Sequence, residues 1–120
     1  MKKVIMTLLM ILLVATLVLA NEAKTMMLKG YIVDNKCSGK QTEAQMDEFI
    51  KTHSKECAIS EECKISGYSI YADHKLYKFD KKSNEKVAEF LQKPDTKLLV
   101  VAEVKEEGKE VSLISIKNEE

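Results

Sequence analysis

The chain has 120 residues, of which 45% are hydrophobic and 32% charged, and its 19 lysines balance 19 acidic residues to a formal net charge of zero. This balance excludes the strongly basic footprint of nucleic-acid-binding domains. Arginine, the side chain that phosphate recognition favours, is absent from the sequence. We therefore expect no nucleic-acid partner.

The first 20 residues have the pattern of a secretory signal peptide. Lys2 and Lys3 precede an almost unbroken apolar run from Val4 to Leu19, and Ala20 stands where a signal peptidase cleaves. The apolar run of about 16 residues is shorter than the roughly 20 that a membrane-spanning helix needs. We expect cleavage, export to the periplasm or the cell exterior, and membrane contact only through this segment. An uncleaved signal anchor is the alternative.

The remaining residues are enough for one domain with a modest core. Residues 21–25 are polar and are expected to form a flexible leader, and residues 26–117 form the domain. We expect a monomer. Alternating apolar side chains predict strands at 26–33, 68–72, 75–79, 98–104 and 111–116.

Local signals add detail to these strands. Asp73 and His74 form a tight hairpin turn, in which histidine tolerates a positive φ. A change of phase between Leu113 and Ile114 indicates a β-bulge, and Gly30 indicates a bulge or sharp bend within the first strand.

A capping box predicts the start of a helix within a segment between the first two strands. Thr42 and Gln45 have the spacing of the box, and apolar residues follow at helical intervals from Met46 to His53. One further helical turn would place Cys57 beside His53.

A second helical pattern covers residues 80–93 and ends before Pro94. The order is strand, insertion, strand, strand, helix, strand, strand. We therefore predict a mainly β (α+β) fold: a five-stranded OB-fold-like Greek-key barrel with an insertion at residues 34–67. A small α+β roll is the main alternative.

The insertion contains all three cysteines and one of the two histidines, in the pattern Cys-x15-His-x3-Cys-x5-Cys. Thiolate and imidazole donors suit zinc, copper or a haem-type iron centre. Four such donors form a closed site of structural rather than catalytic type. The predicted metal ligands are Cys37, His53, Cys57 and Cys63.

A disulfide is the competing interpretation, because exported thiols tend to pair. The possible pairings differ by only about 1 kcal/mol in loop entropy, which does not select one. Cys37–Cys63 would join the end of the first strand to the start of the second and would leave Cys57 beside His53.

We expect a binding or accessory role, with a metal ion or a protein as partner and no catalytic turnover. The alternatives are a thiol-redox enzyme that uses Cys57 near His53 and a disulfide-stabilised protein-interaction module. The absence of a CxxC motif counts against the redox enzyme, and one helical turn is poor geometry for a catalytic dyad. Asp34 is interpreted as a turn residue that could also orient His53 or bind the metal.

One set of motifs extends over most of the chain after residue 20. It consists of Gly30-Tyr31-Ile32-Val33-Asp34-x-x-Cys37, then His53, Cys57, Cys63 and Gly67, then a hairpin that ends Lys75-Leu76-Tyr77-Lys78-Phe79. The pattern resembles an uncharacterised family of small secreted bacterial domains with an OB-like fold. Tyr31, Ser38 and His74 replace the family's tryptophan and two of its glycines. The resemblance implies an exported OB-like domain and no particular activity. It also implies one shared site made of Asp34, Cys37, His53, Cys57 and Cys63.

Overall fold

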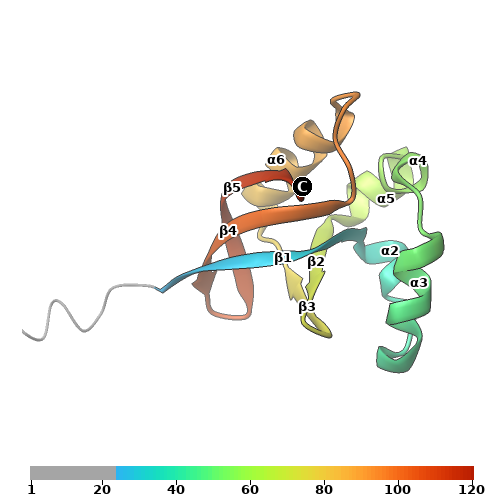
Figure 1. Ribbon diagram of the computed structural model, residues 1–120, viewed down its shortest axis with the longest axis horizontal. Coiled ribbons are helices and arrows are strands. Elements are labelled where there is room, and N and C mark those ends of the chain that lie inside the picture. Colours follow the sequence, from blue (N-terminus) through green and yellow to red (C-terminus); the bar gives the residue numbers. More distant parts are fainter. Residues whose placement is uncertain (1–23) are drawn as a thin grey trace, which may run out of the picture.

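A computed structural model describes residues 24–120, so the predicted signal peptide and the first part of the leader lie outside the described residues. The described chain is a five-stranded antiparallel open sheet with several helices, in the strand order β3-β2-β1-β4-β5 (Figure 1). No helix among residues 24–120 is long and apolar enough to cross a membrane. The elements are β1 (Thr25–Asp34), α2 (Asn35–Ser38), η1 (Glu43–Gln45), α3 (Met46–Thr52), α4 (Lys55–Ala58), α5 (Glu61–Ser66), β2 (Tyr68–Ala72), β3 (Lys75–Lys78), α6 (Lys81–Gln92), β4 (Leu99–Glu107) and β5 (Glu110–Asn118).

The first strand, β1, is long and central, as predicted. Its first part pairs with β4 from Thr25 to Tyr31, and its last part pairs with β2 from Tyr31 to Asp34. The strand begins at Thr25, and the carbonyl of Lys24 accepts a hydrogen bond from the backbone of Glu106, so the end of the expected leader continues the sheet. The register with β4 passes through Gly30 without a bulge.

Gly30 is explained instead by the close approach of β2. A Cβ atom at this position would collide with the backbone carbonyl of Tyr71 and press on the side chain of Ala72. The missing side chain lets the backbones of β1 and β2 approach each other where β1 changes its pairing from β4 to β2.

Two local predictions for the strands are confirmed. Asp73 and His74 have φ values of 50° and 60° in the two-residue turn between β2 and β3. Opposite β4, the register moves from Ser115 directly to Leu113, which leaves Ile114 as the extra residue of a bulge.

The helix predicted at residues 80–93 is also confirmed. Asp80 caps α6 by accepting a hydrogen bond from the backbone N–H of Ser83 at 2.8 Å. The helix buries Val87 and Leu91 completely, in the core beneath the sheet. An isolated parallel bridge joins Phe79, next after β3, to Val111 of β5.

The segment between β1 and β2 folds into short helices gathered at one end of the sheet (Figure 1). The capping box of Thr42 and Gln45 is present. The helix does not continue to Cys57, but donor atoms of His53 and Cys57 still lie within 4.8 Å of each other. His53 adopts an extended backbone, and the Ser54 hydroxyl accepts a hydrogen bond from the Cys57 N–H at 3.1 Å, which starts a new helix, α4.

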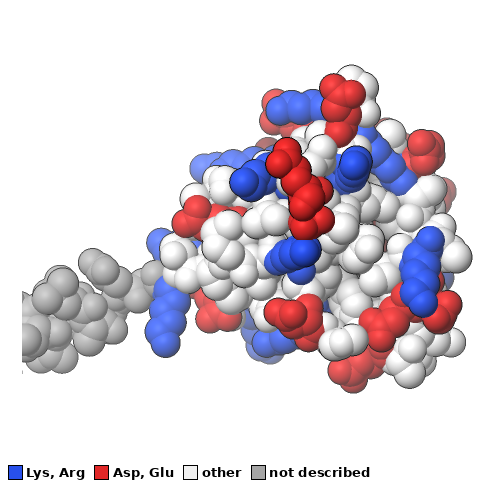
Figure 2. Space-filling view, in the orientation of Figure 1, with Lys and Arg blue, Asp and Glu red and all other residues white. Residues whose placement is uncertain are grey.

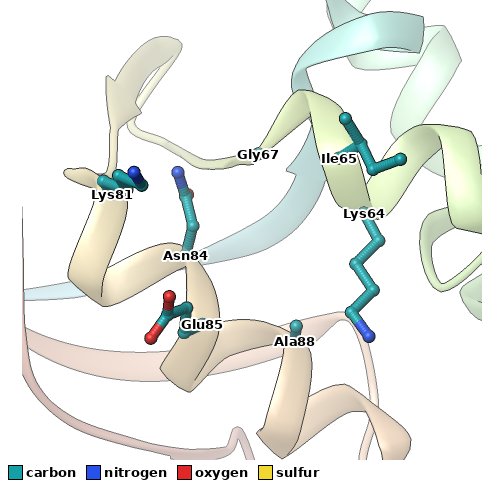
Figure 3. A pocket seen from close by; sticks show the side chains of 7 residues that line it. All are labelled: Lys64, Ile65, Gly67, Lys81, Asn84, Glu85 and Ala88. Atoms are coloured by element: carbon teal, nitrogen blue, oxygen red, sulfur yellow. The ribbon is translucent and has the colours of Figure 1, made fainter.

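Charged side chains of both signs are interspersed on the face shown in Figure 2, and neither sign forms a continuous patch there. Beside α5 and α6 the surface has a groove of about 210 Å³ with Gly67 and Asn84 among its lining residues (Figure 3). Asn84 extends from α6 toward Gly67 in this view. Its side-chain oxygen accepts a hydrogen bond from the Tyr68 N–H at 2.9 Å, which fixes the start of β2.

Replacing Gly67 by alanine is expected to lower the free energy of unfolding by about 1–3 kcal/mol. Gly67 has φ 83° and ψ 180°, a conformation that residues other than glycine rarely adopt, and a Cβ atom would lie 2.7 Å from the Asn84 side-chain nitrogen. Urea unfolding measures the loss. Gly108→Ala is the matched control, because Gly108 has φ 65° but no atom within 4 Å of the added Cβ. Equal losses in the two variants would contradict the role of the Asn84 contact.

Candidate metal centre

Asp34 is the central residue of the candidate site. It is the last residue of β1 and is completely buried. One carboxylate oxygen, Oδ2, accepts a hydrogen bond from the Cys37 N–H at 2.8 Å and caps α2, while Oδ1 lies 2.7 Å from Nε2 of His53. Asp34 therefore ends the strand, starts the next helix and orients the histidine. The sequence favoured the turn role and left orientation of His53 and metal binding as further roles for Asp34.

His53 follows the last turn of α3, and only 3% of its side chain is exposed. Its ring packs against Phe49 with ring centroids 4.8 Å apart. Because the Asp34 carboxylate accepts, Nε2 carries the proton of the pair. The other ring nitrogen, Nδ1, is buried and has no hydrogen-bond partner within residues 24–120. An unpaired buried nitrogen of this kind is the usual ligand atom of a metal-binding histidine.

The site brings together three of the four predicted ligands. Four residues each offer one donor atom, and these four atoms all lie within 4.8 Å of one another: Asp34, Cys37, His53 and Cys57. The fourth predicted ligand, Cys63, lies outside that group and is buried on α5, the helix bonded to α2. All three cysteines are free thiols, and none is paired as a disulfide.

Contacts between α2 and α5 hold these cysteines in place. Asn35 donates from its backbone to the Gly67 carbonyl at 2.9 Å and from its side chain to the Ser66 carbonyl at 3.1 Å. The Lys36 N–H donates to the Ser66 hydroxyl at 3.1 Å, and the Lys36 side chain forms an ion pair with Glu62. The two helices that carry the first and last cysteines are thus fixed to each other although 30 residues separate the bonded positions Lys36 and Ser66.

The electrostatics of the site favour a charged Asp34 carboxylate and neutral thiols at Cys37 and Cys63. Burial opposes ionisation of Asp34, but hydrogen bonds from His53, the Cys37 backbone and the two nearby thiols outweigh it and lower its pKa to about 2. Burial and the neighbouring Asp34 raise the pKa of Cys37 to about 12. At Cys63 a hydrogen bond with Ser60 favours the thiolate, but burial and Asp34 prevail and the pKa is raised.

Raised thiol pKa values are the opposite of what a nucleophilic cysteine needs. A bound cation has the opposite effect on the thiols, because it stabilises thiolates directly and displaces their protons. The ionised Asp34 supplies negative charge that attracts such a cation. Cys37 and Cys63 are therefore better suited to metal binding than to thiol catalysis.

The chain has no match among known protein families, curated proteins or solved structures. The geometry of the donor atoms therefore carries the functional conclusion.

One further residue, Tyr68, positions the site and was not among the predicted site residues. Its side chain is completely buried, and its hydroxyl donates a hydrogen bond of 2.7 Å to the carbonyl of Ala58 at the end of α4. Burial, together with the charge of Asp34 and Cys63, raises the Tyr68 pKa to about 12, so the hydroxyl remains a donor. Tyr68 thereby ties the helix of Cys57 to the sheet.

Replacing Tyr68 by phenylalanine is expected to lower the free energy of unfolding by about 1–3 kcal/mol, since the buried Ala58 carbonyl loses its side-chain partner. Denaturant unfolding of the metal-free chain measures this effect. Tyr77→Phe is the control: Tyr77 is only partly buried, and its expected effect is within about 0.5 kcal/mol. A Tyr68→Phe protein as stable as the control would show that the hydrogen bond contributes nothing.

Proposed function

We propose that the chain is an exported domain that binds one zinc ion through Cys37, His53, Cys57 and a fourth donor, either Asp34 or Cys63. The observation that carries the proposal is the convergence of four metal-ligating side chains within 4.8 Å. Donor atoms in a tetrahedral zinc site lie roughly 3.3–3.8 Å apart, as follows from its bond lengths. Small side-chain movements are enough to close the observed group around an ion.

Zinc is the ion that this mixture of donors favours. It accepts thiolate, imidazole and carboxylate ligands together, whereas copper(I) prefers soft sulfur donors. A haem iron uses only one or two axial protein ligands, so four converging donors favour a bare ion. Copper and a haem-type iron centre are thereby less well supported than zinc.

A site with four protein ligands has no open position for a substrate, which is typical of structural zinc. We therefore assign the domain a binding or accessory role without turnover. The raised pKa values of the Cys37 and Cys63 thiols argue against either of them as a redox nucleophile. The absence of a CxxC motif counts against the alternative of a thiol-redox enzyme that uses Cys57. All three cysteines are free thiols, so the described residues do not support the alternative of a disulfide-stabilised interaction module.

The proposed setting of the site is an OB-like barrel in a secreted monomer. The strand order, the position of α6 between β3 and β4, and the parallel bridge from Phe79 to Val111 support the barrel. The signal-peptide pattern of the first 20 residues supports export. The resemblance to small secreted bacterial domains supports both.

Native mass spectrometry of the reduced chain, loaded with zinc, tests the proposal. We expect one zinc ion per chain, released on denaturation, followed by alkylation of all three cysteines. His53→Ala is expected to abolish binding, and His74→Ala, which changes the exposed histidine of the hairpin turn, is expected to retain it. Wild-type protein that takes up no zinc, or the same zinc content in both variants, would overturn the proposal.

A further inference from the structure

We propose that the fourth ligand is Cys63 and that Asp34 remains outside the coordination sphere as a positioning residue for His53. The ion is then held by three sulfurs and Nδ1 of His53. This inference rests on the proposed function and assigns the coordination chemistry of the same site.

Both carboxylate oxygens of Asp34 already accept hydrogen bonds. Oδ1 accepts from His53 Nε2 at 2.7 Å, and Oδ2 accepts from the backbone of Cys37 at 2.8 Å. Coordination by either oxygen would weaken the orientation of the histidine or the cap of α2. A carboxylate that holds the far nitrogen of a metal-bound histidine is a recurrent arrangement around zinc.

The unpaired ring nitrogen of His53 also supports this arrangement. With Nε2 donating to Asp34, the ligand atom of the histidine is Nδ1, the one buried side-chain nitrogen or oxygen without a partner in the described part of the chain. If Nδ1 binds the ion, this nitrogen gains a partner and the hydrogen bond from Nε2 to Asp34 stays intact. Direct coordination by Oδ1 of Asp34 would instead compete with the hydrogen bond that orients His53.

Cys63 lies on α5, the helix that is hydrogen-bonded to α2, which carries Cys37. Only 5% of Cys63 is exposed. The contacts of Asn35 and Lys36 with α5 keep it there. Loss of the thiol proton leaves a buried thiolate, a donor that zinc accepts.

The coordination step has a definite proton balance. A zinc ion and three thiols give a complex of three zinc–sulfur bonds, and three protons pass to solvent; no electron is transferred. Coordination by Asp34 in place of Cys63 would release only two protons, because a carboxyl group, unlike a thiol, is ordinarily ionised at neutral pH. The two arrangements therefore differ by one proton and one sulfur.

X-ray absorption spectroscopy and proton release on zinc addition to the reduced wild-type chain provide the test. We expect three sulfur ligands and one nitrogen ligand, with three protons released per zinc. Two sulfurs and two protons would overturn the inference while leaving zinc binding itself established. An absence of zinc binding would overturn both the inference and the proposed function.

Two variants separate the roles of Cys63 and Asp34. Cys63→Ser is expected to reduce the sulfur count to two and to weaken zinc binding. Asp34→Asn is expected to keep three sulfurs and to lower the zinc affinity by about 10–100-fold, as loss of an orienting carboxylate does. If Asp34→Asn changes the ligand set and Cys63→Ser leaves the zinc affinity unchanged, Asp34 is the ligand. The wild-type measurements decide the question even if either variant folds poorly.

Discussion

Saturating zinc is expected to raise the midpoint of thermal unfolding of the reduced chain by roughly 15–30 °C. The reason is that the helices between β1 and β2 have little core of their own. Their buried apolar residues are Met46, Ala58 and Cys63. Helices of four to seven residues are too short to be stable alone. An ion that joins α2, α4, α5 and the end of α3 replaces the missing apolar contacts.

The magnitude follows from linkage. A ligand at one thousand times its dissociation constant, bound only by the folded state, adds about 4 kcal/mol to the free energy of unfolding. Each kcal/mol moves the midpoint of a domain of this size by about 4–8 °C.

Circular dichroism during heating, with zinc or with a chelator present, measures the shift. Magnesium is expected to produce none, since it prefers oxygen donors. His74→Ala should respond to zinc as the wild type does, and His53→Ala should not respond. An equal rise in the midpoint for His53→Ala would mean that zinc acts elsewhere on the chain.

The strands were predictable because their signals are local. Alternating apolar residues, the turn at Asp73 and His74, and the phase change at Ile114 each depend on a few neighbouring residues, and all three appear as expected. For Gly30 the sequence indicated a bulge or a sharp bend, and the bulge is absent for a non-local reason. That glycine is required by the backbone of β2, about 40 residues further along the chain, which local patterns do not reveal.

The membership of the site was predictable in part, and its internal arrangement was not. The cysteines and His53 stood out by residue type and by their confinement to one segment. The helix break after His53 was missed because the cap by Ser54 competes with an apolar pattern that suggests continuation. The three-residue spacing from Asp34 to Cys37 is that of a helix cap, which was the available signal for the central role of Asp34.

Acidification of the metal-free chain is expected to remove about 2 kcal/mol of stability through Asp34 alone. The pKa of this carboxyl is lowered from 3.8 in the unfolded chain to about 2 in the folded one. A group with a lowered folded pKa stabilises the fold above its unfolded pKa and loses that contribution as the pH falls through its folded pKa. The contribution is therefore complete above about pH 5 and is lost progressively towards pH 2 and below.

The measurement is the free energy of urea unfolding between pH 7 and pH 2 in the presence of a chelator, for the wild type and for Asp34→Asn. Asparagine cannot ionise and offers one acceptor oxygen where two donors, His53 Nε2 and the Cys37 N–H, require partners. The variant is thus expected to be less stable than the wild type at pH 7, by about 2 kcal/mol or more.

The difference between the two proteins is the informative quantity, because titration of the other carboxylates cancels in it. Asp80, whose pKa is also lowered because its hydrogen bonds with Ser83 outweigh the opposing effect of burial, contributes equally to both proteins. The difference should shrink as the pH falls from about 5 towards 2, where the wild-type carboxyl takes up its proton. A difference that stays constant over this range would show that the Asp34 charge is not what stabilises the start of α2 and the orientation of His53. It would also remove the basis for assigning Asp34 a positioning role at the metal centre.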